Sequence, residues 1–129
     1  MPVPIAPKLL ILAVAGACGT LARYGMAGVA QRLGGDWFPW GTFAVNVFGC
    51  LLFGLVYALA EDRVLISGQT RFFVLVGFMG AFTTFSTFIF ESGDLLRDGQ
   101  MWRAFANLGG QAALGLTALF VGLVLGRLV

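Results

Sequence analysis

The chain has 129 residues, of which 59% are hydrophobic and 11% are charged, with a formal net charge of +2 and no histidine. This composition excludes a soluble globular domain, whose surface needs more charged side chains. A helix needs about 20 apolar residues to cross a bilayer, which leaves room for four spans and short loops. We therefore predict an all-α membrane protein, a single transmembrane domain over residues 1–129 with no nucleic-acid partner.

Charge-free stretches mark the predicted spans. Turn-forming segments such as Gly34-Gly35-Asp36 and Asp98-Gly99 separate them. The expected spans cover residues 5–30, 41–60, 72–90 and 104–126. Four spans place both termini on the same side of the membrane.

In the first span Lys8 precedes an apolar run, and the residues Ala15–Cys18 are loosely similar to a lipoprotein cleavage site. Apolar sequence continues beyond these residues, so we interpret the segment as a span and not as a signal. Arg23 lies toward the far end of the span. Cys18 and Cys50 both fall inside predicted helices, where we expect small apolar packing residues and no disulfide or metal framework.

The second span contains Asn46 between Val45 and Val47. An amide in hydrocarbon without hydrogen-bond partners is strongly unfavourable. We therefore expect Asn46 to face protein or water.

The third span carries the most informative segment, residues 77–88, in which glycines and hydroxyl groups interrupt an apolar run. Such an interruption is tolerated at membrane depth only where protein or a water-filled path surrounds it. We predict that this helix is broken near its centre and lines a solute pathway. Thr84, Thr87 and Glu91 follow at helical spacing and predict a polar stripe that leads to a vestibule.

Three phenylalanines, Phe82, Phe85 and Phe88, recur every three residues along the same segment. Such a stripe is typical of packing. An aromatic ring is also positive at its edge, so these rings could contact an anion instead. Both interpretations stay open on the residues alone.

The fourth span contains Asn107, Gln111 and Thr117, which we interpret as hydrogen-bonding groups between neighbouring helices. The glycine pair Gly122 and Gly126 has the spacing of close helix contacts. We expect a packing role for these glycines, as for others such as Gly25, Gly28, Gly49 and Gly54.

Positive charge is balanced across the predicted membrane. The terminal side has Lys8, Arg63, Arg71 and Arg127, and the other side has Arg23, Arg32, Arg97 and Arg103. Without a bias in basic residues the insertion direction is not fixed. We hypothesise dual topology and an antiparallel homodimer with self-complementary contacts.

No catalytic constellation is present, so we do not expect an enzyme. The polar groups within the spans are amides and hydroxyls, apart from Arg23, which favours a small anion over a cation as the solute. A proton-coupled small multidrug exporter is the alternative, but such proteins need a carboxylate inside a span and the first span has none. A non-transporting membrane scaffold is a third reading.

Three motifs of this chain closely resemble the Fluc family of microbial fluoride channels. They are Gly19-Thr20-Leu21-Ala22-Arg23-Tyr24, Gly41-Thr42-Phe43-Ala44-Val45-Asn46 and Gly80-Ala81-Phe82-Thr83-Thr84-Phe85-Ser86-Thr87-Phe88. The resemblance implies a fluoride-selective channel in the cell membrane, the inner membrane of a bacterium, that gives passive fluoride efflux through two pores of an antiparallel homodimer. Ala81 departs from the family, which is expected to have a second glycine there.

The resemblance also implies site residues. Asn46 would line the pathway, Phe85 and Phe88 would be its paired phenylalanines, and Ser86 and Thr87 would extend a polar track. Phe82 would be structural. A structural sodium ion would sit at the dimer centre, held by the backbone carbonyls of Gly80 and Thr83. With the polar stripe, the predicted pathway comprises Asn46, Thr84, Phe85, Ser86, Thr87 and Phe88, with Arg23 and Glu91 at the vestibule.

Overall fold

The computed structural model describes residues 2–129, and these fold into helices without a β-strand. The elements are α1 (Ile5–Gly34), α2 (Trp40–Glu61), α3 (Gly68–Phe72), the π-helix η1 (Phe73–Met79), α4 (Gly80–Phe82), α5 (Phe85–Arg97) and α6 (Met101–Leu128). Four helical stretches are long and apolar enough to cross a membrane: Ile5–Gly34, Trp40–Glu61, Gly68–Arg97 and Met101–Leu128. The all-α, four-span prediction is therefore confirmed, and each helical stretch is longer than the span expected from the sequence.

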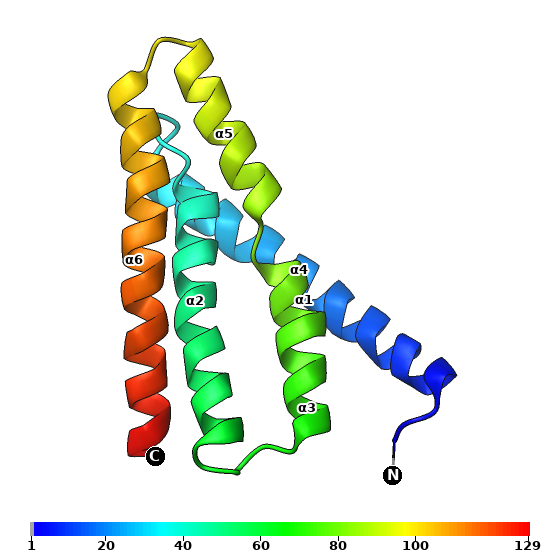
Figure 1. The fold of residues 1–129 in the computed structure, drawn as a ribbon. Helices are drawn as coiled ribbons and strands as arrows, with labels where there is room; N and C mark the ends of the chain where they lie inside the picture. The colour runs from blue at the N-terminus through cyan, green and yellow to red at the C-terminus, as the bar shows by residue number, and fades with distance from the viewer. Residues whose placement is uncertain (1) are drawn as a thin grey trace.

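The helices form a bundle in which α2 and α6 run side by side while α1 crosses obliquely behind the third span (Figure 1). Helix α1 packs on η1, α4 and α2, and α5 packs on α6. Both chain termini lie at the same end of the bundle, as four spans require (Figure 1).

The turn between α1 and α2 is fixed by one side-chain amide. Gly35 ends α1 with φ of 83°, a left-handed conformation that favours glycine. Gln31 Nε2 then donates to the carbonyls of Gly35 (2.7 Å) and Phe38 (2.9 Å), and Gln31 Oε1 accepts from the amide of Gly41 (3.0 Å). This places the start of α2, which carries Asn46, firmly against the end of α1.

The third span is interrupted at Thr83 and Thr84, which adopt extended backbone conformations with ψ of 159° and 116°. The predicted break is confirmed, and Figure 1 shows the resulting gap between α4 and α5. Thr84 caps α5, because its Oγ1 accepts from the amide of Thr87 at 3.3 Å. The sequence did not predict the π-helix η1 that precedes the break.

Glycines allow α2 and α6 to approach to backbone contact. A Cβ added at Gly122 would lie 2.1 Å from the carbonyl oxygen of Leu51, and one added at Gly54 would lie 2.2 Å from that of Leu119. The packing prediction is confirmed for Gly122 and Gly54. It is wrong for Gly25 and Gly28 within the chain, where an added Cβ has no atom within 4 Å.

We expect Gly122→Ala to destabilise the bundle, because the new methyl group collides with backbone that cannot yield as a side chain does. Overpacking of this kind costs about 1–3 kcal/mol. Gly109→Ala is the matched control on the same helix, since its Cβ meets no atom within 4 Å. Thermal unfolding followed by circular dichroism in detergent should show a lower midpoint for Gly122→Ala alone, and equal midpoints would contradict this packing account.

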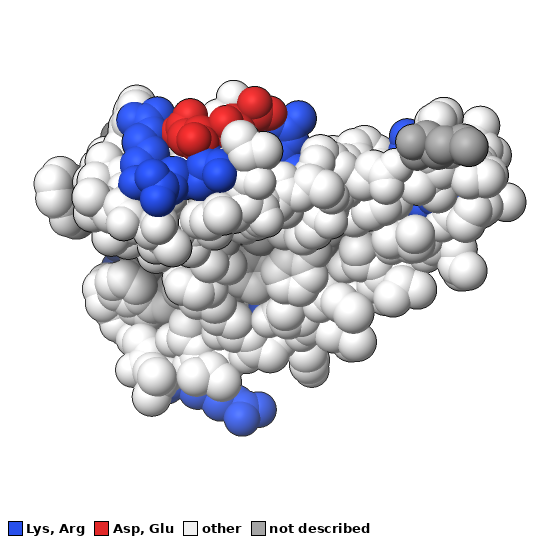
Figure 2. Space-filling view, turned by 90° about the horizontal axis from the view of Figure 1, so that it is seen from below, with Lys and Arg blue, Asp and Glu red and all other residues white. Residues whose placement is uncertain are grey.

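Charged side chains pair at the end of the bundle that carries the termini. Arg71 forms an ion pair with Glu61, and Arg127 forms one with Asp62. Figure 2, which looks onto this end, shows acidic and basic side chains gathered together on part of a largely uncharged face. These exposed pairs mark the boundary of the apolar body and contribute little to stability individually.

Candidate functional site

The side chain of Asn46 clamps the break in the third span. Its Nδ2 donates to the carbonyl oxygen of Thr84 (3.0 Å), and its Oδ1 accepts from the amide of the same residue (2.8 Å). Helix α2 thereby supplies both hydrogen bonds that the extended backbone of Thr84 needs inside an apolar bundle. The expectation that Asn46 faces protein or water is confirmed, since its partners are protein groups.

The break leaves two carbonyl oxygens without their usual helical donors. In an unbroken helix the Thr84 amide would donate to the carbonyl of Gly80, but it donates to Asn46 instead. Likewise the Thr87 amide donates to Thr84 Oγ1 in place of the Thr83 carbonyl. Carbonyl oxygens freed at the ends of broken helices are ligands that suit a hard cation such as sodium. The carbonyls of Gly80 and Thr83 therefore fit the predicted ion chemically. Residues 2–129 hold no cluster of carboxylate, histidine or cysteine side chains that could bind a metal.

The three phenylalanines do not share one face, because the break separates them. Phe82 is buried before the break, with 2% of its surface exposed, and its ring stacks on Phe78 at 5.8 Å. After the break, the rings of Phe85 and Phe88 lie edge to face, 5.9 Å apart, and Phe85 is 74% exposed. Phe82 therefore has a packing role, whereas Phe85 has few neighbours within its own chain.

An open groove of about 410 Å³ runs along the break. Its lining brings together residues from α2, the break, α5 and α6, and none of them is charged. They are Asn46, Gly49, Cys50, Phe53, Thr83, Thr84, Phe85, Phe88, Gln111, Ala112 and Leu119. The groove thus joins four predicted pathway residues, Asn46, Thr84, Phe85 and Phe88.

Ser86 and Thr87 lie on the first turn of α5 and do not line the groove. Thr87 Oγ1 accepts a hydrogen bond from Thr84 Oγ1 at 3.0 Å, which links it to the break. Ser86 is exposed on the chain.

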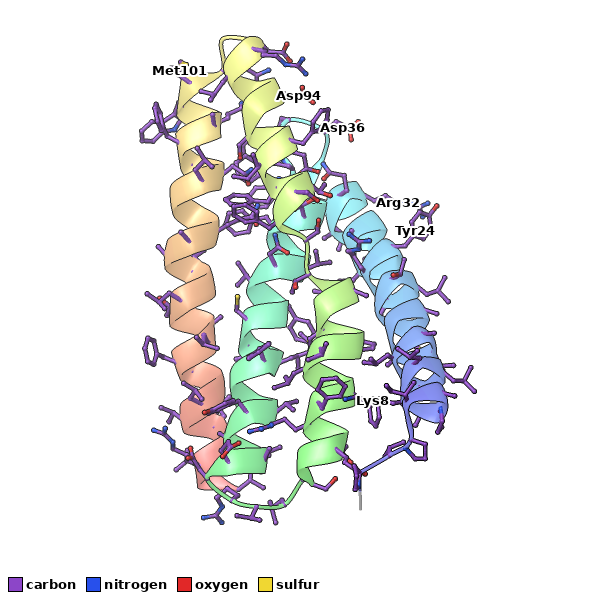
Figure 3. The ribbon with its side chains drawn as sticks, turned by 45° about the vertical axis from the view of Figure 1, so that its right-hand side comes forward. Lys8, Tyr24, Arg32, Asp36, Asp94 and Met101 are labelled. Carbon is purple, nitrogen blue, oxygen red and sulfur yellow. The ribbon has the colours of Figure 1, made fainter. Side chains whose placement is uncertain are left out.

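Glu91 and Arg23, the two predicted vestibule residues, are not brought into the groove. Glu91 Oε1 accepts from Thr42 Oγ1 (2.9 Å), which joins α5 to α2. Glu91 and Thr42 line a separate hollow of about 560 Å³ beside α1, together with Tyr24 and Arg32. Figure 3 shows Tyr24 and Arg32 projecting from the same part of α1. Arg23 is partly exposed on α1 and lies outside the lining of both hollows.

Two residues of α6 join the site through hydrogen bonds. Gln111 Oε1 accepts from Asn46 Nδ2 (2.8 Å), and Gln111 Nε2 donates to Asn107 Oδ1 (2.9 Å). Asn107 is fully buried and donates to Ser92 Oγ at 2.9 Å. The sequence interpretation of Gln111 and Asn107 as interhelical bonding groups is confirmed, but it missed that their partners include Asn46. Their spacing of four residues on one helix face was the available signal.

Comparisons with known proteins agree on one family. A family model described as CrcB-like protein, Camphor Resistance (CrcB), matches residues 10–123. Similar relatives include a protein of Nitrosococcus oceani that is 53% identical over 122 residues, covering 95% of this chain and 98% of the relative. A protein of Solidesulfovibrio magneticus is 56% identical over 122 residues with the same coverage, and one of Nitratidesulfovibrio vulgaris is 55% identical over 123 residues, also with that coverage. All three relatives bear the name fluoride-specific ion channel FluC.

Proposed function

The chain belongs to the CrcB-like family, and from this membership and the site geometry we propose that it is a fluoride-selective channel that gives passive fluoride efflux. The observation that carries the proposal is the uncharged groove at the break, where Asn46 and Thr84 lie beside the exposed ring of Phe85. Ring edges offer positive potential to an anion without a fixed charge. The hydroxyl groups of Ser86 and Thr87 add donors near the groove, since Thr84 Oγ1 already donates to Thr87 Oγ1.

The chemistry of the groove speaks against the alternative of a proton-coupled exporter. Such transport needs a carboxylate within a span, and no carboxylate lines the groove. Passive flow is sufficient for fluoride, which enters a cell from acidic surroundings as the neutral acid and is trapped inside as the anion. We assign no enzymatic role, and place the chain in the cell membrane, which for a bacterium is the inner membrane.

Fluoride efflux from liposomes tests this function. Vesicles loaded with potassium fluoride and containing the purified protein should release fluoride to an ion-selective electrode when valinomycin supplies the counter-current. Release should not require a proton gradient. Protein-free vesicles provide the baseline, and fluoride release at that baseline, or proton-dependent drug uptake, would contradict the proposal.

A second copy of the chain in antiparallel orientation would complete the pathway. The groove is open along one side, and Phe85 is 74% exposed there, so a single chain cannot separate an ion from lipid. The balance of basic residues across the membrane supports insertion in both directions. The resulting dimer would have two pores, with Arg23 and Glu91 toward their entrances. A reporter fused to the C-terminus that appeared on only one side of the membrane would contradict dual topology.

A sodium ion at the centre of that dimer would serve a structural role, by satisfying the freed carbonyls of Gly80 and Thr83 from both copies. Unpaired buried carbonyls are costly, and oxygen ligands suit this cation. The hydroxyl group of Thr83 is engaged elsewhere, because Oγ1 donates to the carbonyl of Met79 at 3.0 Å. The backbone, and not the side chain, is therefore the proposed ligand.

From this geometry we expect Thr83→Ala and the closer-shaped Thr83→Val to retain sodium-dependent stabilisation. The measurement is the thermal unfolding midpoint in sodium chloride against N-methylglucamine chloride, which has no cation small enough for the site. Wild-type protein and both variants should be stabilised by sodium. Loss of this sodium effect in both variants, with helical content intact, would show that the hydroxyl is the ligand and contradict the assignment.

A further inference from the structure

We infer that Gln111 is a positioning residue for the fluoride pathway, acting through a hydrogen-bonded chain that fixes the side chain of Asn46. This series of hydrogen-bonded side chains, the amide relay, comprises Asn46, Gln111, Asn107 and Ser92. The inference rests on the proposed function, which it deepens by assigning a role to the fourth span.

The amide relay runs in a single direction. Asn46 donates to Gln111 (2.8 Å), Gln111 to Asn107 (2.9 Å) and Asn107 to Ser92 (2.9 Å). Ser92 then donates from its hydroxyl to the carbonyl of Phe88 at 2.8 Å. Each member donates to the next and the last acceptor is a backbone carbonyl, so no member can reverse without losing a bond.

The direction is set by the backbone of Thr84. Its amide can only donate and its carbonyl can only accept, so Oδ1 of Asn46 must face the amide and Nδ2 the carbonyl. One Nδ2 hydrogen remains, and it points to Gln111 Oε1. Gln111 is 6% exposed, so water does not compete freely for that position. An acceptor at residue 111 is what completes the hydrogen bonding of Asn46.

The amide relay also ties the first turn of α5 at both ends. Its first member, Asn46, is bonded to Thr84, the residue that caps α5, and its last member, Ser92, donates to the carbonyl of Phe88. Phe85 and Phe88 project from the turn held between these points. Through this arrangement α2 and α6 together fix the positions of the two rings, although Gln111 itself lies on neither the break nor α5.

The relay can be tested by magnetic resonance because Asn46 and Asn107 are the only asparagines in the sequence. Protein labelled with isotopic nitrogen at asparagine, purified as the full assembly in lipid nanodiscs, gives two side-chain amide signals that both belong to the relay. Gln111→Met keeps a side chain of similar length without donor or acceptor. Thr117→Val is the matched control, since Thr117 lies on the same helix and its hydroxyl donates only to the carbonyl of Ala113.

We expect Gln111→Met to shift both asparagine signals, to speed hydrogen exchange of the Asn46 amide, and to lower fluoride current about tenfold or more. Thr117→Val should leave the signals and the current unchanged. Asn107→Leu removes the acceptor of Gln111 and leaves Asn46 as the single asparagine signal. We expect this signal to shift, with a smaller loss of current than in Gln111→Met. Asn107→Leu also serves as the test variant if Gln111→Met does not assemble.

Two outcomes would overturn the inference. Unchanged Asn46 signals in Gln111→Met and Asn107→Leu would show that no relay fixes this amide, even if current falls. Shifted signals with wild-type current would show that the relay exists but does not position the pathway. The signals report on the relay even if the wild-type protein carries no fluoride, so failure of the proposed function would be recognised separately.

Discussion

Asn46→Asp is expected to reduce fluoride transport by about a hundredfold or more while the helices remain assembled. The amide end of Asn46 donates to the carbonyl of Thr84 and to Gln111 Oε1, and a carboxylate would turn both contacts into repulsion between acceptors. It also places a negative charge beside the proposed path of an anion. Two like charges about 4 Å apart repel by about 4 kcal/mol at an effective dielectric constant of about 20, which corresponds to about a thousandfold in rate.

The measurement is fluoride current in planar bilayers at mildly alkaline pH, where an aspartate is ionised most fully. Asn46→Ala separates the loss of the clamp from the added charge, and we expect its current to lie between those of Asn46→Asp and the wild type. Size-exclusion chromatography should give the same elution volume for all three proteins. Wild-type current in well-assembled Asn46→Asp would remove Asn46 from the pathway.

Phe85→Ile and Phe88→Ile should each produce assembled protein with strongly reduced fluoride efflux. If these rings only filled space, volume-conserving apolar exchanges would cost under about 1.5 kcal/mol and leave transport intact. Fluoride holds its water tightly, so every lost ring-edge contact raises the barrier, and about 1.4 kcal/mol of added barrier slows passage tenfold. The 74% exposure of Phe85 makes a packing role within the chain a poor explanation for that ring.

Phe82→Ile is the control for these two variants, since its buried ring stacks on Phe78 before the break. We expect a lower thermal unfolding midpoint for Phe82→Ile, with most of the fluoride efflux retained per assembled protein. Efflux is measured with a fluoride electrode at matched protein density. Undiminished efflux in both Phe85→Ile and Phe88→Ile would return the two rings to a packing role.

The break in the third span and the four-helix class could be predicted because both depend on local composition. Glycine and threonine at membrane depth conflict with a lipid-exposed helix, so the sequence near Gly80 and Thr84 carries its own signal. The structure adds which residue resolves the conflict. Asn46, 38 residues away in sequence, satisfies both backbone groups of Thr84.

Other parts of the site depend on tertiary contacts that one-dimensional spacing does not reveal. The three-residue spacing of Phe82, Phe85 and Phe88 predicts one stripe, but this holds only while the helix is continuous, and the extended backbone at the break sends Phe82 into the core. No motif in the sequence marks Gln111, because its role depends on a contact between two helices, in which Gln111 Oε1 accepts the remaining hydrogen of Asn46 Nδ2. The family membership agrees with the resemblance drawn from the three motifs.

The central claim, a pathway selective for fluoride, is tested most directly by the reversal potential of the wild-type protein in a planar bilayer with fluoride on one side and chloride at equal concentration on the other. An uncharged groove that replaces the water of a small anion by ring edges and hydroxyl groups should carry fluoride and almost no chloride. The account predicts a reversal potential displaced strongly toward the equilibrium potential of fluoride. A reversal potential near zero, with chloride carrying comparable current, would contradict it.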